Sequence, residues 1–148
     1  MFLRLKNNGQ KMVNAEAICS VSGGIKRGTL VDHLGAKATP DTFAGIAVRG
    51  EMVDDRVAMG LKANVFADSQ DLIAQNAYFG IEPIYAMEEY ATTEFDTVTV
   101  TNETEAKKKM TIEDGKLKVD DSTGTFQGLG FRTLPGSDVK FLAFRRIK

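Results

Sequence analysis

The sequence predicts an all-β fold, a small β-barrel or β-tulip-like domain built from a duplicated strand-hairpin unit. Three observations lead to this expectation. A short strand unit occurs twice, as TFAGIAVR in 42–49 and as TFQGLGFR in 125–132. Glycine, at 14 residues, far outnumbers proline, at 3, which is typical of short strands joined by tight turns. Several segments alternate apolar and polar residues with the period of a strand.

The chain has the length of one domain. Its 148 residues are enough to bury a substantial core. We expect an N-terminal arm at 1–14 and a single β domain at 15–148, with repeat copies at about 24–60 and 80–144. Residues at about 93–114 then form a hairpin insertion in the second copy.

Short β-branched runs between glycine and aspartate clusters indicate the individual strands. The strands expected in the first half are 2–6, 15–21, 29–32, 43–49, 56–60 and 64–67. Those expected in the second half are 82–87, 96–102, 109–112, 116–119, 126–132 and 138–145. At most one short helix is expected, at 68–79 (DSQDLIAQNAYF), with Asp68 or Ser69 as its cap and Gly80 as its end.

The segment 96–101 (DTVTVT) has the clearest alternation, and its valines are expected to point into the core. The polar run ETEAKKK follows Asn102 and leads to MTI. This order predicts a projecting hairpin over 101–109, whose tip carries Glu103, Glu105 and the three lysines 107–109.

The repeated unit matches in residue type as well as in length, with four of its eight positions identical. Gly45 and Gly128 occupy the same place in the two copies, so each marks a bulge or a close approach of another backbone, or serves only internal packing. A hairpin turn, expected at 50–55 in the first copy and at 133–137 in the second, and then a second strand follow. A looser match extends the repeat backwards, pairing 24–31 with 80–87.

The composition of the chain argues against several classes of function. A formal net charge of −1 argues against nucleic acid as a partner. The sequence has no apolar run long enough to cross a membrane, and the opening MFLRLKNN lacks the apolar core of a signal peptide. Cys19 is the only cysteine, which excludes an intramolecular disulfide. We expect Cys19 to be a buried structural thiol and the protein to be made in a reducing compartment.

No catalytic, cofactor-binding or metal-binding residues can be assigned, so we expect a protein that is not an enzyme. His33 is the only histidine and is interpreted as a loop residue. Paired carboxylates at 54–55, 88–89 and 120–121 lack the spacing of a calcium loop and are attributed to turn chemistry. The segment 23–28 (GGIKRG) lacks the Gly-Lys-Ser/Thr ending of a phosphate-binding loop, so it is interpreted as a strand connection.

The order of parts between about Gly24 and Phe144 resembles that of the head decoration or capsid cement proteins of tailed bacteriophages. The segments that carry this resemblance are GTLVDHLG, TFAGIAVRGEMVDDRVAM, GIEPIYAM, GKLKVDD and TFQGLGFRTLPGSDVKFLAF. They follow a recurrent pattern of turn, glycine and strand, then Phe-x-Gly-apolar-Ala, then a Gly or Asp turn and a final strand. The insertion at 93–114 departs from the minimal pattern of the family.

The resemblance implies a structural virion protein, made in the host cytoplasm, that binds the capsid exterior and cements adjacent major capsid protein subunits. It also implies self-association, as a trimer or a dimer, and an N-terminal arm that adds a strand to a neighbouring edge. The expected contact residues are Phe2, Leu3, Arg4, Leu5, Lys6, Lys107, Lys108 and Lys109.

Two other functional classes stay open from the sequence. One is a ligand- or glycan-binding module on a virion or cell surface, for which the nearest aromatic cluster is Tyr78, Phe79, Tyr85 and Tyr90. The absence of tryptophan argues against it. The other is an enzyme with a small barrel site, which the single histidine and the turn-bound carboxylates disfavour.

Overall fold

The computed structural model describes residues 1–6, 15–48 and 72–147. It confirms the all-β fold, since the described residues form antiparallel strands and contain no α-helix. The strands are β1 (Phe2–Lys6), β2 (Ala15–Ile18), β3 (Ile25–Lys26), β4 (Leu30–Val31), β5 (Gly45–Val48), β6 (Leu72–Ile73), β7 (Tyr78–Glu82), β8 (Glu89–Thr92), β9 (Lys109–Glu113), β10 (Lys116–Val119), β11 (Phe126–Thr133) and β12 (Lys140–Arg146). One 3-10 turn, η2 (Glu105–Lys107), lies between β8 and β9.

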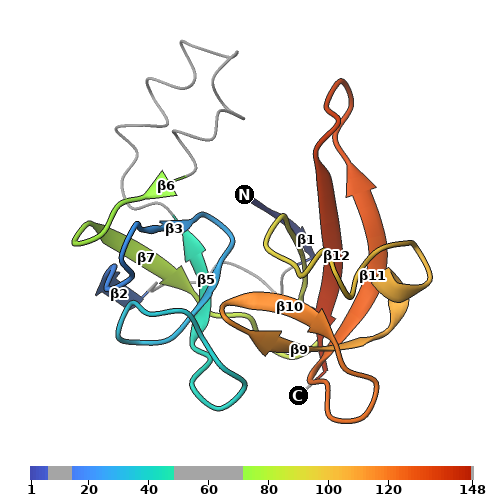
Figure 1. The fold of residues 1–148 in the computed structure, drawn as a ribbon, viewed down its shortest axis with the longest axis horizontal. Coiled ribbons are helices and arrows are strands. Elements are labelled where there is room, and N and C mark those ends of the chain that lie inside the picture. Colours follow the sequence, from blue (N-terminus) through green and yellow to red (C-terminus); the bar gives the residue numbers. More distant parts are fainter. Residues whose placement is uncertain (7–14, 49–71, 148) are drawn as a thin grey trace.

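The strands form three sheets. A six-stranded sheet has the order β1-β8-β12-β11-β9-β10, and a four-stranded sheet has the order β2-β7-β5-β4. Strands β3 and β6 pair in a third, two-stranded sheet. Figure 1 shows the six-stranded sheet curling into a half-barrel on the right, with the four-stranded sheet beside it on the left.

The main hydrophobic core lies between the two larger sheets, because both contribute side chains to it. Its buried members are Phe2, Leu30, Ala38, Ile46, Val48, Ile84, Tyr90, Phe95, Val100, Ala106, Met110, Ile112, Leu117, Phe126, Leu142 and Phe144. Aromatic rings link the sheets, with the ring centroids of Phe43 and Phe126 5.4 Å apart in an edge-to-face arrangement. The two sheets therefore share one core.

Hydrogen bonds also join the two sheets, at the turn between β9 and β10. Asp114 and Gly115 both have positive φ, 50° and 73°, as a two-residue Asp-Gly hairpin loop requires. The Leu30 amide donates to the Gly115 carbonyl over 2.9 Å, and the Gly115 amide donates to the Ala38 carbonyl over 3.2 Å. A turn of the six-stranded sheet is thus bonded to the segment around β4.

The repeated glycines lie where the backbone of another segment comes close. A Cβ at Gly45 would stand 2.3 Å from the Glu82 carbonyl oxygen, and one at Gly128 would stand 2.2 Å from the Ala106 carbonyl oxygen. The β11–β12 register also shifts between Gly128 and Gly130. The expectation of a close approach is confirmed in both copies, although β5 and β11 belong to different sheets.

The backward extension of the repeat is not matched by the strands. Residues 80–87 contain the end of β7 and a turn, in which the Glu88 amide donates to the Tyr85 carbonyl over 3.2 Å. The strand expected at 82–87 is therefore wrong, and β8 was missed. The strands expected at 56–60 and 64–67, and the first-copy turn at 50–55, lie outside the described residues.

The expected helix at 68–79 is wrong over its described part. Residues 72–73 form β6, and β7 begins at Tyr78. Between them Asn76 has φ 66°, which a helix does not allow. The Asn76 amide donates to the Cys19 carbonyl, and the Cys19 amide donates to the Ala77 carbonyl, over 2.8 and 2.9 Å. Pairing with this distant segment overrides the local helical pattern.

The strand and the hairpin expected over 96–109 are also wrong. Residues 97–99 form a turn, because the Asp96 carboxylate accepts the Val98 amide over 3.0 Å and the Thr99 hydroxyl over 3.0 Å. Val98 is 81% exposed, whereas Val100 is buried as expected. Residues 101–108 form a loop that contains η2, and the hairpin of this region is β9–β10.

The segment expected to be a free arm is a strand of the fold. β1 pairs with β8 in the six-stranded sheet, and Phe2 is buried in the main core. The N-terminal ammonium donates to the Arg27 carbonyl and, over 3.0 Å, to the Thr93 hydroxyl. Residues 2–6 are therefore held in this chain's own sheet, which corrects the expectation of an arm available to a neighbour.

Candidate binding surface

The hairpin formed by β11 and β12 projects from the body of the protein. Its two strands stay paired out to Thr133 and Lys140. The neighbouring strands stop earlier, since β9 pairs with β11 at Phe126 and Gln127 alone, and β8 pairs with β12 no farther out than Leu142. Figure 1 shows this hairpin, in orange and dark red, rising above the other strands. Its distal half therefore has no further strand beside either edge.

The tip of the hairpin has a defined conformation. In Leu134-Pro135-Gly136-Ser137 the Ser137 amide donates to the Leu134 carbonyl over 3.0 Å, and Gly136 has φ 77°. Proline followed by a glycine of positive φ is the preferred sequence of a type II turn. The Ser137 hydroxyl also accepts the Val139 amide over 3.1 Å. The turn expected at 133–137 is confirmed.

η2 supports the base of the hairpin. The Asn102 side chain accepts the Thr104 and Glu105 amides over 2.9 and 3.0 Å, which starts the turn, and Ala106 is buried. The Gly128 amide donates to the Lys108 carbonyl over 2.9 Å. The expected contact residues Lys107, Lys108 and Lys109 are thereby brought against β11.

Local side chains occupy the backbone groups on the free edge of β11. The Glu103 carboxylate accepts the Phe131 amide over 3.1 Å, and this bond lowers the pKa of Glu103. The Arg132 guanidinium donates to the Phe131 carbonyl over 2.9 Å. Because an unpaired edge invites strand addition, these bonds to the Phe131 backbone make strand addition at this point of β11 less favourable.

Across residues 103–109 and 126–140 five cations stand against three carboxylates, Glu103, Glu105 and the exposed Asp138, which leaves an excess of positive charge. Lys107 pairs with Glu103 over 3.4 Å, and Lys108 pairs with Glu105 over 3.0 Å. In the described part of the chain no carboxylate lies within ion-pair distance of the remaining cations, Lys109, Arg132 and Lys140. The Lys140 ammonium lies 5.5 Å from the centroid of the Phe131 ring. This surface therefore favours an acidic partner.

β1 is held by a buried carboxylate. The Arg4 Nε donates to both oxygens of Glu82, over 2.8 and 2.9 Å, and the Tyr90 hydroxyl donates to Oε1 over 2.8 Å. Glu82 is buried. Burial, followed by the bond to Glu82, raises the pKa of Tyr90. A carboxylate that accepts this many hydrogen bonds is a structural clamp, and it places Arg4 on the inner side of β1.

The other expected contact residues of β1 differ in exposure. Leu3 is half-buried and packs against a cluster around Phe141 on the outer face of the sheet. Leu5 and Lys6 are exposed. Lys6 lies opposite Glu89 in β8. Arg4 is exposed as well, with 49% of its side chain accessible beside its bonds to Glu82. Arg4, Leu5 and Lys6 are therefore the side chains of the segment that are open to a partner.

The aromatic residues considered for ligand binding do not form one site. Phe79 and Tyr90 are buried, whereas Tyr78 and Tyr85 are 74% and 55% exposed. Tyr78 begins β7, and Tyr85 lies in the turn beyond its other end. The two exposed rings are thus separated along the strand.

The remaining chemical candidates have structural roles. His33 is exposed in a turn, and Cys19 is buried, both as expected. The Asp120 carboxylate accepts the Ser122 and Thr123 amides over 3.0 and 3.1 Å, which confirms turn chemistry there; its bonds to Thr123 and Ser122 lower the pKa of Asp120. In the described residues no three metal-ligating side chains come together, and no helix is long and apolar enough to cross a membrane.

Sequence reasoning missed Arg132 and Lys140 as candidate contact residues. The structure distinguishes β11 and β12 by their lengths, eight and seven residues, against five or fewer in every other described strand. From the sequence, strands of seven residues are also expected at 15–21, 43–49 and 96–102, so length alone does not single out the hairpin. Long paired strands around a Pro-Gly turn predict a hairpin that extends beyond its neighbouring strands.

Comparison with known proteins found no matching family model, curated protein or solved structure.

Proposed function

We propose that this chain is a structural virion protein that binds the outer surface of a phage capsid and stabilises it by cementing adjacent major capsid protein subunits. The proposal depends on one observation, the projecting β11–β12 hairpin with Arg132 and Lys140, which have no carboxylate within ion-pair distance among the residues that the structure describes. Such an element can lie across the seam between two subunits and contact both. The order of sequence parts that resembles capsid cement proteins supports the same function.

The proposed mechanism is interfacial. Arg132 and Lys140 contact acidic side chains of the capsid, while the half-buried Leu134 and Val139 supply apolar contact near the tip. The partner is thus a protein surface, not a nucleic acid or a membrane. The protein is made in the host cytoplasm and ends on the capsid exterior, where self-association as a dimer or trimer multiplies weak contacts.

Co-sedimentation with empty capsid-like particles from the same source tests the proposal. We expect the protein to sediment with the particles and to raise their temperature of thermal rupture. The double variant R132E/K140E should bind at least about 10-fold more weakly, since each reversed charge opposes an acidic surface. The control K6E changes an exposed cation of β1 instead and should bind as the natural chain does.

Circular dichroism spectra establish first that both variants are folded. Absence of co-sedimentation by the natural chain would refute capsid binding. Binding that K6E weakens and R132E/K140E leaves unchanged would assign the contact to β1 and refute the role of the hairpin.

A further inference from the structure

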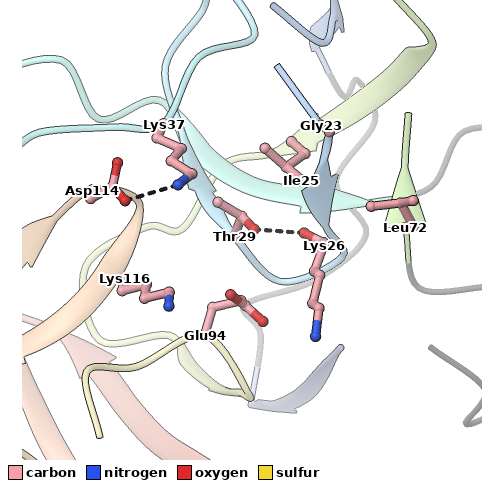
Figure 2. Close-up of a pocket in the computed structure, with 10 residues that line it drawn as sticks. Gly23, Ile25, Lys26, Thr29, Lys37, Leu72, Glu94, Asp114 and Lys116 are labelled. Carbon is pink, nitrogen blue, oxygen red and sulfur yellow. Dashed lines mark hydrogen bonds and ion pairs between the residues drawn. The ribbon is translucent and has the colours of Figure 1, made fainter. Parts of the chain in front are cut away.

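A polar groove lies between the two-stranded β3–β6 sheet and the β9–β10 turn of the six-stranded sheet, and no residue of the β11–β12 hairpin lines it. Its volume is about 260 Å³. The residues that line it come from five separate segments: Gly23, Gly24, Ile25, Lys26, Thr29, Lys37, Leu72, Glu94, Asp114 and Lys116. Figure 2 shows their side chains around one opening. Grooves between packed units are common sites for small ligands.

The walls of the groove are held by close backbone packing. A Cβ at Gly24 would stand 2.4 Å from the Ile73 carbonyl oxygen, and one at Gly115 would stand 2.8 Å from the Thr29 methyl group. The Thr29 hydroxyl donates to the Lys26 carbonyl over 2.7 Å. These contacts fix the backbone of Lys26 relative to the β9–β10 turn, so the groove is formed before any ligand binds.

The charges of the groove do not balance. It contains three lysines and two carboxylates. Lys37 is paired with Asp114 over 2.8 Å, and Glu94 accepts the Thr93 hydroxyl over 3.4 Å. In the described part of the chain no carboxylate lies within ion-pair distance of Lys26 or Lys116. Figure 2 shows the ends of these two side chains on either side of Glu94.

We propose that this groove binds a multivalent oxyanion, the phosphate or carboxylate groups of a small molecule, with Lys26 and Lys116 as its direct ligands. Two ammonium groups supplied by different sheets can donate to two oxygens of one anion. Glu94 opposes the anion and so weakens binding. Asp114 neutralises Lys37 and keeps the third cation from taking part. The 23–28 segment is a strand connection, and it contributes Lys26 to this site.

Titration of the ¹⁵N-labelled natural chain with inorganic phosphate, and separately with citrate, tests the site. Ionic strength is held constant with sodium chloride at pH 7. We expect saturable amide shifts around residues 23–26 and 114–116, with a dissociation constant of about 1 mM. Phosphate binding alone would identify a phosphate ligand, and tighter citrate binding a polycarboxylate; either result supports the proposal.

Variants that change the charge of the groove test whether anion affinity changes in the predicted direction. K26Q and K116Q should each weaken binding about 3- to 10-fold, and E94Q should strengthen it about 3-fold. K109Q removes an exposed lysine outside the groove and should leave binding unchanged. Shifts that rise linearly without saturation, equal loss in K109Q, or weaker binding by E94Q would each refute the site. Since no capsid is present, the result is independent of the proposed capsid binding.

Discussion

Two glycines occupy positions where even the methyl side chain of alanine does not fit. Neither Gly45 nor Gly128 has a positive φ, so conformational freedom is not the reason for either. A Cβ at each would instead meet a backbone carbonyl oxygen closer than 2.4 Å, that of Glu82 or of Ala106. Backbone atoms in a paired strand or a buried turn cannot move aside cheaply. The identity of both residues is therefore fixed by packing.

Gly128→Ala and Gly45→Ala should each lower the free energy of unfolding by about 2–3 kcal/mol, because the added methyl group forces two packed segments apart. Thr133→Ala, an exposed change on the same strand as Gly128, should cost less than about 0.5 kcal/mol. Urea denaturation measures all three. A G128A protein as stable as T133A would contradict the close approach of η2 to β11.

At the scale of single elements, the sequence predicts strands well where apolar side chains enter a core on alternate positions. β11 and β10 follow this pattern, with Phe126, Gly128 and Leu117 buried. The same alternation in DTVTVT does not give a strand, since the Asp96 carboxylate bonds the Val98 amide and begins a turn. Side-chain bonds to the local backbone compete with sheet pairing, and alternation alone does not reveal which prevails.

Long-range pairing explains the other differences. The local sequence of 68–79 favours a helix, but the Cys19 backbone forms hydrogen bonds with residues 76 and 77. This distant pairing cannot be predicted from the local sequence. The charged residues at 101–109 predict a solvent-exposed hairpin tip, but the structure has the short turn η2 there. A run of charged residues shows only that the segment is exposed to solvent. The groove is lined by five separate segments of the chain, so no local sequence motif predicts it. Sequence reasoning did identify two of its features separately, the 23–28 connection and the 116–119 strand.

Strand β1 depends on Arg4, which crosses from the six-stranded sheet to Glu82 in β7. Arg4→Ala should lower the free energy of unfolding by about 2–4 kcal/mol, because it removes the guanidinium that donates to both oxygens of the buried Glu82 carboxylate. Arg4 is partly exposed, so the expected loss is smaller than for a fully buried pair. Lys6→Ala, on the exposed end of the same strand, should change stability by less than about 0.5 kcal/mol.

Urea denaturation of the two variants at pH 7 makes this comparison. Equal stabilities of R4A and K6A would show that the Arg4–Glu82 pair does not stabilise β1 in the sheet. A large loss in R4A alone would place β1 within the cooperative core.

At the scale of the whole molecule, the shared core and the β9–β10 turn make the two larger sheets one structural unit. Ile46 and Val48 of the four-stranded sheet lie in the same cluster as Phe126 and Phe144 of the other. The Gly115 backbone adds two hydrogen bonds across the junction. The four-stranded sheet also packs on a second cluster around Phe79 and Cys19, but the main core draws side chains from both larger sheets, so we expect them to unfold together.

Gly115→Ala tests this cooperativity at the junction. The methyl group would meet Thr29 at 2.8 Å and the Leu30 carbonyl oxygen at 2.9 Å, at a residue with φ 73°. The matched control is Gly136→Ala at the hairpin tip, where φ is 77° but no atom lies within 4 Å. Both variants incur the strain of a positive φ, about 1–2 kcal/mol. Only G115A also disturbs the contact between the sheets.

Hydrogen exchange of amides in β5 and β12 then reports on each sheet. We expect G115A to lower protection equally in both strands, and by more than G136A does, because opening either sheet exposes the common core. If protection in β5 were unchanged while that in β12 fell, the sheets would be independent units.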